Sequence, residues 1–207
     1  MLWLLEELGV PYELVRYERD AVTQLAPPEL RKVHPLGKSP VITDGGAAIA
    51  ESGAILEYLV ETYGEGRFAP ARGTPAYLRH RYFMHYAEGS LMPLLLMKYV
   101  FGRVRTAKVP FFIKPLTRKI ARQVEGTFVD PNLARHFAFL DGELATSPWF
   151  AGDELTVADV QMSYPMEALA SRVPEVPARI TDWLLRAKAR PAYQRATERG
   201  GPSLLEL

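Results

Sequence analysis

The sequence predicts two parts of different architecture, a small α/β part at residues 1–66 and an all-helical part at residues 74–207. Short apolar runs separated by turn signals occur in the first part. From residue 74 onward the strand signals stop, and apolar residues recur at helical spacing. The stretch GEGRFAPARGTP, residues 64–75, is rich in Gly and Pro, which indicates a connection between the two parts.

The chain opens on a predicted helix. In MLWLLEELGV, Leu2, Leu5 and Leu8 recur at helical spacing on one face, and two glutamates lie on the other. YELVRY at residues 12–17 is rich in aromatic and branched side chains and predicts a short strand. APPELRKV at residues 26–33 predicts a short helix, because a proline suits its first turn.

A hairpin and a helix complete the first part. Two apolar runs, at residues 41–43 and 47–50, flank Asp44-Gly45-Gly46, which is a strong hairpin signal. From Ser52, SGAILEYLVETY has apolar residues on one helical face and predicts a helix.

The second part is a series of predicted helices. A long helix follows Thr74, and we expect a kink at Pro93 because proline cannot donate the helical hydrogen bond. Residues 111–144 predict one or two further helices, and LTVADVQMSYPMEALA, at residues 155–170, predicts another. Residues 177–188 predict a last helix, followed by a short tail.

Composition excludes several classes of function. The chain carries 25 basic and 24 acidic residues, so the molecule as a whole has no general attraction to nucleic acid or to an anionic membrane. No apolar run reaches the roughly 18 residues of a membrane span, and nothing indicates export, so we expect a cytoplasmic protein. The absence of Cys excludes disulfides and thiolate metal ligands. His80 and His85 are five apart, a poor spacing for a metal pair, and we expect no metal.

Three short motifs suggest a binding site. The first is HPLGKSPVITD, where a cis Ser39–Pro40 bond would leave the backbone of Ser39 free to pair with an extended peptide. Lys38 beside this turn is placed to meet a carboxylate. The alternative is a surface lysine before an ordinary trans proline, the commoner isomer.

The second motif is AESGAI, where a predicted strand ends and a helix begins. A helix start offers unpaired N–H groups and a positive dipole end for an anion, and the Ser52 hydroxyl adds a donor. Glu51 beside it would pair with an ammonium group, so that together they would recognise the head of an α-amino acid. The alternative is an N-capping serine next to a solvated glutamate.

The third motif, FAGDELTVADV, is structural. Thr156 and Asp159 are spaced as a capping box at the start of a helix, with Asp in place of the usual Glu or Gln. We expect its loss to cost about 0.5–2 kcal/mol of stability.

Taken in chain order, these motifs resemble the cytosolic glutathione transferases. LGKSPVI…AESGAILEYL looks like the glutathione-binding stretch of that family, and GDELTVADV looks like the capping motif of its helical domain. Three further stretches look like a fungal and bacterial, Gtt-like subgroup of that family: LWLLEELGVPYELVRY, APPELRKVHPLGKSPV and HYAEGSLMP. The resemblance covers nearly the whole chain and implies a thioredoxin-like N-terminal domain followed by an all-α domain.

The resemblance also implies roles for single residues. Lys38 would hold the glycine carboxylate of glutathione, and Ser39, with Pro40 cis, would pair its backbone with the cysteinyl unit. Glu51 and Ser52 would hold the γ-glutamyl head.

The long helix from residue 76 would line the pocket for an apolar electrophile, the candidates being Tyr82, His85, Tyr86 and Met92. Packing at the interface between the domains is the alternative for each. Glu88 would either reach the glutathione amine across a dimer or be an ordinary solvated charge.

The resemblance also implies an activity: the conjugation of glutathione to apolar electrophiles, or the reduction of hydroperoxides with glutathione. It implies a homodimer as well. Family members carry a strand and a turn before their first helix, and a Ser, Tyr or Cys in that turn stabilises the glutathione thiolate. Because LWLLEELGVPYEL matches the family from its first helix onward, we expect that strand and the catalytic residue upstream of Met1, and weak or absent thiol transfer by these 207 residues alone. The alternative is a non-catalytic protein of the same fold that binds glutathione or a ligand, or acts as a scaffold.

Overall fold

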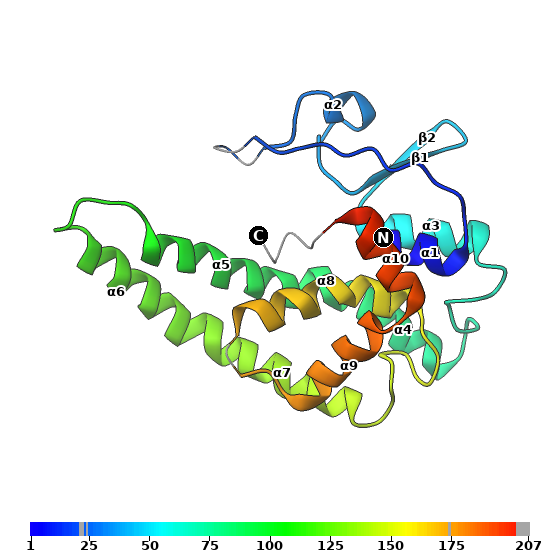
Figure 1. Cartoon of the computed structure of the whole chain (residues 1–207). Helices are drawn as coiled ribbons and strands as arrows, with labels where there is room; N and C mark the ends of the chain where they lie inside the picture. The colour runs from blue at the N-terminus through cyan, green and yellow to red at the C-terminus, as the bar shows by residue number, and fades with distance from the viewer. Residues whose placement is uncertain (21–22, 24, 174, 202–207) are drawn as a thin grey trace.

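A computed structural model describes residues 1–20, 23, 25–173 and 175–201. Their first part combines helices with a small sheet (Figure 1): α1 (Leu2–Leu8), α2 (Leu30–Val33), β1 (Val41–Asp44), β2 (Ala47–Ala50) and α3 (Ser52–Tyr63). The second part is built of helices: α4 (Pro75–Tyr86), η1 (Ala87–Leu91), α5 (Met92–Thr106), α6 (Lys114–Val124), η2 (Glu125–Val129), α7 (Asp130–Leu144), α8 (Val157–Arg172), α9 (Ala178–Lys188) and α10 (Pro191–Gly200). The predicted fold class, an α/β part followed by an all-helical part, is confirmed.

The predicted hairpin is present, and the geometry of its turn explains why Gly45 and Gly46 occur there. β1 and β2 pair antiparallel. Gly45 and Gly46 have φ values of 54° and 85°, and a two-residue type I′ turn requires positive φ at both central positions. The carboxylate of Asp44 accepts hydrogen bonds from the hydroxyls of Tyr58 and Tyr63, which ties the hairpin to α3.

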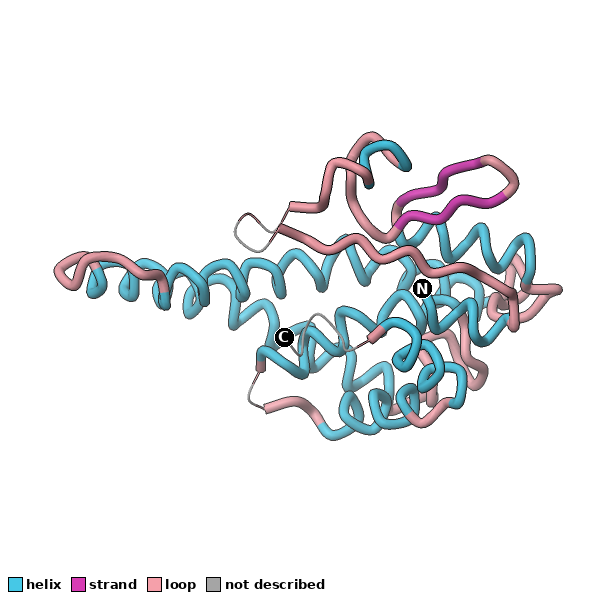
Figure 2. Tube along the Cα trace, turned by 45° about the horizontal axis from the view of Figure 1, so that its top comes forward, coloured by secondary structure: helices cyan, strands magenta, loops and turns pink. Residues whose placement is uncertain are grey.

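The predicted strand at residues 12–17 is wrong. This segment is irregular, and it crosses the molecule as a loop in Figure 2. A strand needs a neighbour to complete its ladder of hydrogen bonds, and no described segment pairs with this one. Leu14 and Val15 are therefore left 39% and 60% exposed rather than buried on one face of a sheet.

The predicted long helix after Thr74 exists, but its interruption differs from a kink at Pro93. α4, η1 and α5 follow without a loop, and the irregularity is a π-helical turn at Ala87–Leu91, just ahead of the proline. Proline lacks the N–H of a regular helix, and the wider π turn changes the hydrogen-bond pattern at this point. α6, η2 and α7 form a second long helix, and α5 and α6 make a hairpin that projects from the body (Figures 1 and 2).

α8 lies at the centre of the core. It contacts α3, α4, α5 and α9, and its side chains are buried on nearly all sides, from Val157 to Leu169. Trp183, Phe83 and Phe150 are among the largest fully buried side chains around it. A helix that is apolar all round belongs in a protein interior, so the position of α8 fixes the elements that contact it.

The start of α8 is held by one buried carboxylate. Thr156 and Asp159 form a capping box, and Asp159 also accepts the backbone N–H of Phe150 at 2.9 Å. Burial raises the pKa of Asp159 to about 6, while the hydrogen bonds from Phe150 and Thr156 oppose that shift. The carboxylate is therefore ionised at neutral pH and serves several donors at once.

The predicted tail after residue 188 is wrong, because residues 191–200 form α10. This helix packs against α1, and the red and blue ribbons lie side by side in Figure 1. Arg190 donates to both carboxylate oxygens of Glu7, Nε to Oε1 at 2.5 Å and Nη2 to Oε2 at 3.0 Å. Arg195 donates to Glu6 at 2.8 Å. Contacts across the fold, which spacing in the sequence does not reveal, stabilise this helix.

Replacing Asp159 tests the role of the buried carboxylate. Asp159→Ala leaves the N–H groups of Phe150 and Thr156 without their acceptor, so we expect the free energy of unfolding to fall by at least about 2 kcal/mol. Chemical denaturation measures the change. The control Asp153→Ala removes a nearby exposed carboxylate, and equal effects of the two substitutions would contradict this role.

Replacing Arg190 tests the contact between α1 and α10. Arg190→Ala leaves the mostly buried Glu7 with a weaker set of donors, so we expect a loss of about 1–3 kcal/mol in the free energy of unfolding. Lys188→Ala, at an exposed position at the end of α9, is the matched control. A thermal unfolding midpoint for Arg190→Ala equal to that of this control would show that the ion pair adds nothing.

Candidate functional site

The loop between α2 and β1 presents an exposed peptide edge. The Ser39–Pro40 bond is cis, and Lys38, Ser39 and Pro40 are all exposed. Gly37 has a φ of 56° and donates its N–H to His34 at 2.8 Å, which closes a turn just before these residues. No described residue forms a backbone hydrogen bond with Ser39, so an extended peptide can pair with this edge.

The start of α3 is the second element of the site. Glu51 is the N-cap residue, and its φ of 72° and ψ of 121° are unusual for a residue other than glycine. Such a conformation costs on the order of 1–3 kcal/mol and is typical of binding sites. The side chain of Glu51 does not cap the helix, so the first N–H groups of α3 are available to an anion.

A residue that the sequence reasoning missed connects this helix start to the helical part. Gln161 of α8 is only 5% exposed, and its Nε2 donates to the hydroxyl of Ser52 at 3.2 Å. This hydrogen bond orients the side chain of Ser52 from the side of the helical part. The available signal was a polar residue inside the apolar stretch of a predicted buried helix.

Two carboxylates lie near the start of α3. The pKa of Glu88, on η1, is raised by burial and by the negative charge of Glu51. Glu88 and Glu51 of the same chain are therefore close enough to interact electrostatically. Paired acidic groups beside a helix start favour a ligand with both an ammonium group and a carboxylate.

Three of the four predicted electrophile residues lie together. Tyr82, His85 and Tyr86 line a hollow of about 440 Å³ on α4 and η1, with Leu78, Arg81, Gly89 and Ser90. Met92 is not part of this lining, because it follows the π turn and packs against the core. The structure therefore separates Met92 from the other three candidates.

Aromatic rings form one wall of this hollow, and Arg81 adds a single positive charge to its lining. Tyr86 stacks on Tyr82 and packs against Phe83 and Phe139. Its hydroxyl forms a hydrogen bond with Nδ1 of His136. Burial raises the pKa of Tyr86 and lowers the pKa of His136, so both groups are neutral at neutral pH. The aromatic wall suits the apolar part of a ligand.

Neither a metal-binding cluster nor a membrane-spanning helix is found among the described residues. They contain no group of three or more His, Asp or Glu side chains placed to hold a metal ion. Burial lowers the pKa of His80 to about 4, whereas His85 is exposed, so the two histidines do not face a common ligand. None of the described helices has the length and hydropathy to cross a membrane.

Comparison with known proteins identifies the family. Residues 1–61 match the model of the glutathione S-transferase N-terminal domain, and residues 106–191 match that of the C-terminal domain. Glutathione S-transferase 1 of Saccharomyces cerevisiae is 32% identical, the match covering 96% of this chain and 89% of that protein. Glutathione S-transferase 3 of Schizosaccharomyces pombe is 34% identical, covering 100% of this chain and 85% of that protein.

A solved structure agrees with these matches. The crystal structure of a glutathione S-transferase from Actinobacillus pleuropneumoniae is 31% identical and superimposes with a TM-score of 0.75, covering 99% of this chain and 89% of the other. Sequence and fold therefore agree along nearly the whole length. This chain belongs to the glutathione S-transferase family.

Proposed function

We propose that the chain binds glutathione as a co-substrate along the edge from Lys38 to Ser52. Lys38 attracts the glycine carboxylate, and the backbone of Ser39 pairs with the cysteinyl unit. The Ser52 hydroxyl and the first N–H groups of α3 hold the γ-glutamyl carboxylate, while Glu51 faces the ammonium group. Family membership and the charge of each group support this assignment.

One observation carries the proposal, the construction of the α3 start. Glu51 has a strained backbone conformation, the N–H groups behind it have no side-chain cap, and Ser52 is held by a buried glutamine. A merely structural helix start would gain from a relaxed Ser or Asp cap instead. An anion supplied by a ligand accounts for all three features.

For the chemistry, we propose conjugation of glutathione to apolar electrophiles. The glutathione thiol loses its proton to solvent, its sulfur forms a bond to the electrophilic carbon, and the leaving group departs with its electron pair. The alternative reaction reduces a hydroperoxide: two glutathione molecules are oxidised to the disulfide, and the peroxide yields an alcohol and water. The aromatic hollow on α4 is the proposed electrophile pocket. On the family resemblance, we further propose a cytoplasmic homodimer that acts in detoxification.

Binding and turnover should be measured together on the same preparation. We expect the chain to bind glutathione in isothermal titration calorimetry. Turnover is measured as conjugation of glutathione to a chlorinated dinitrobenzene and as its oxidation by cumene hydroperoxide, and either reaction would support a transferase. Binding without either reaction would instead support the non-catalytic binding protein. Absence of binding at millimolar glutathione would overturn the proposed site.

Lys38 allows a charge-specific test. Lys38→Ala removes an ammonium group beside the proposed glycine carboxylate, so we expect the dissociation constant for glutathione to rise about tenfold. The control Lys32→Ala removes an exposed charge from nearby α2. The effect should shrink for γ-glutamylcysteine, which lacks the glycine, and an undiminished effect would contradict the assigned contact.

Gln161 tests whether the helical part positions Ser52. Gln161→Leu keeps a similar volume but removes the donor, so we expect glutathione to bind about three- to tenfold more weakly while the protein stays folded. Gln194→Leu, at an exposed position on α10, is the control. KM for glutathione should rise more than kcat falls, and an unchanged KM would refute the positioning role.

A further inference from the structure

The tip of the hairpin between α5 and α6 exposes two aromatic rings. The N–H of Ile113 donates to the carbonyl of Pro110 at 2.9 Å, which closes a tight turn with Phe111 and Phe112 at its central positions. Phe111 is 82% exposed and Phe112 is 69% exposed. Turns usually place Gly, Asn, Asp or Ser there, so these rings are costly in water unless they have a partner.

The tip lies at the far end of the molecule. α6 contacts α5 and η2, and the hairpin extends away from the rest of the fold in Figures 1 and 2. The two rings meet edge to face, with centroids 5.6 Å apart. They therefore form a compact apolar end that a flat surface can reach without obstruction from other described elements.

The charge of this hairpin differs from that of the whole molecule. Residues 98–124 contain eight Lys and Arg residues and no Asp or Glu. The other 180 residues contain 17 basic and all 24 acidic residues. The chain's near-neutral charge therefore conceals a basic hairpin on an acidic body.

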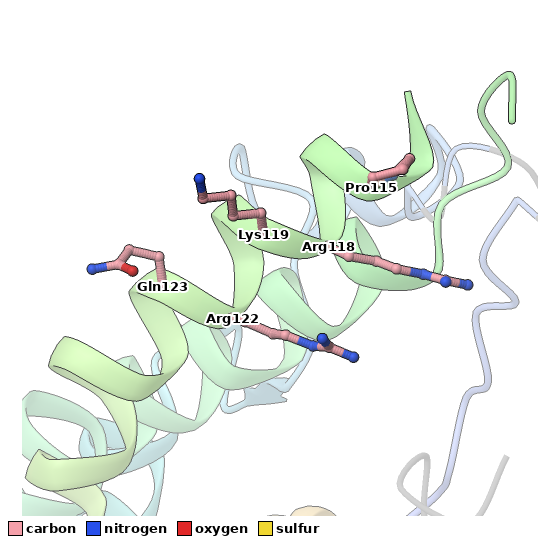
Figure 3. A pocket seen from close by; sticks show the side chains of 5 residues that line it. All are labelled: Pro115, Arg118, Lys119, Arg122 and Gln123. Carbon is pink, nitrogen blue, oxygen red and sulfur yellow. The ribbon is translucent and has the colours of Figure 1, made fainter. Parts of the chain in front are cut away.

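Most of these basic side chains have no acidic partner among the residues that the structure describes. Lys98 pairs with Asp130, and Arg105 pairs with Glu125. No described carboxylate lies within 4.0 Å of the other six, which are Arg103, Lys108, Lys114, Arg118, Lys119 and Arg122. Figure 3 shows Arg118 and Arg122 projecting from one side of α6, and Lys119 from the other, around a hollow on the helix.

We propose that this tip docks on an anionic lipid surface, with Phe111 and Phe112 inserted at the headgroup boundary. Lys108 and Lys114 bracket the apolar residues 109–113, so they reach the headgroups when the rings enter. Arg118 follows about 6 Å further along the helix axis, within the Debye length of roughly 8 Å at physiological salt. An exposed apolar patch with a basic rim has the chemistry of a peripheral membrane contact.

Co-sedimentation with vesicles tests this proposal, which does not depend on the proposed function. We expect the full chain to sediment with vesicles of phosphatidylcholine and phosphatidylserine at low salt, and to be released by high salt or by omission of phosphatidylserine. Phe111→Ser with Phe112→Ser, and separately Lys108→Glu with Lys114→Glu, should each weaken vesicle binding at least about tenfold. The controls Leu185→Ser and Lys188→Glu alter exposed apolar and basic positions on α9 and should bind like the wild type.

Two results would overturn the proposal. One is wild-type protein that stays in the supernatant with phosphatidylserine vesicles at low salt. The other is a change in the molar mass of the lipid-free protein when both phenylalanines are replaced, measured by light scattering. The second result would show that the tip is an interface between copies of this chain. If the serine variant fails to fold, the charge-reversal variant decides the test alone, because its substitutions affect only exposed side chains.

Discussion

The buried carboxylate of Asp159 is the interaction on which the rest of the structure depends. It fixes where α8 begins, because it accepts hydrogen bonds from Thr156 and from Phe150. α8 then contacts α1, α3, α4, α5, α9 and η1. Two residues beyond Asp159, Gln161 donates a hydrogen bond to the hydroxyl of Ser52. The same anchored helix thus stabilises the helical part and positions a donor at the candidate binding site.

The candidate site contains locally unfavourable features that the stability of the core offsets. Glu51 has an unfavourable backbone conformation, and the first N–H groups of α3 lack a side-chain cap. Both features reduce the stability of the free protein and are tolerated because the surrounding packing holds them. In return, the site offers donors and a positive dipole end that need no rearrangement when an anion arrives. The exposed edge at Ser39 adds a place for the rest of an extended peptide.

The sequence predicted those elements that depend on neighbouring residues, and it failed for those that depend on distant contacts. The hairpin was predictable because Gly45 and Gly46 meet the demand of one turn type, and the start of α8 because Thr156 and Asp159 are three residues apart. Residues 12–17 were mispredicted because branched side chains indicate a strand without showing whether it has a partner. α10 was missed because its stabilisation comes from contacts with α1, far away in the sequence.

The site was predictable to a similar degree. Lys38, Ser39, Glu51 and Ser52 lie in contiguous motifs, and each is found in the kind of element that its motif indicated. The contribution of Gln161 depends on the approach of two distant helices, which spacing does not encode. Met92 was separated from the aromatic hollow by the π turn at Ala87–Leu91, which changes the helical faces that a regular period would assign.

The most direct test of the central claim is a crystal structure of this chain soaked or grown with glutathione. Our account predicts that the γ-glutamyl carboxylate lies within hydrogen-bond distance of the Ser52 hydroxyl and the N–H groups at the start of α3, with Gln161 still bonded to Ser52. Glutathione bound elsewhere, with the start of α3 unoccupied, would contradict it.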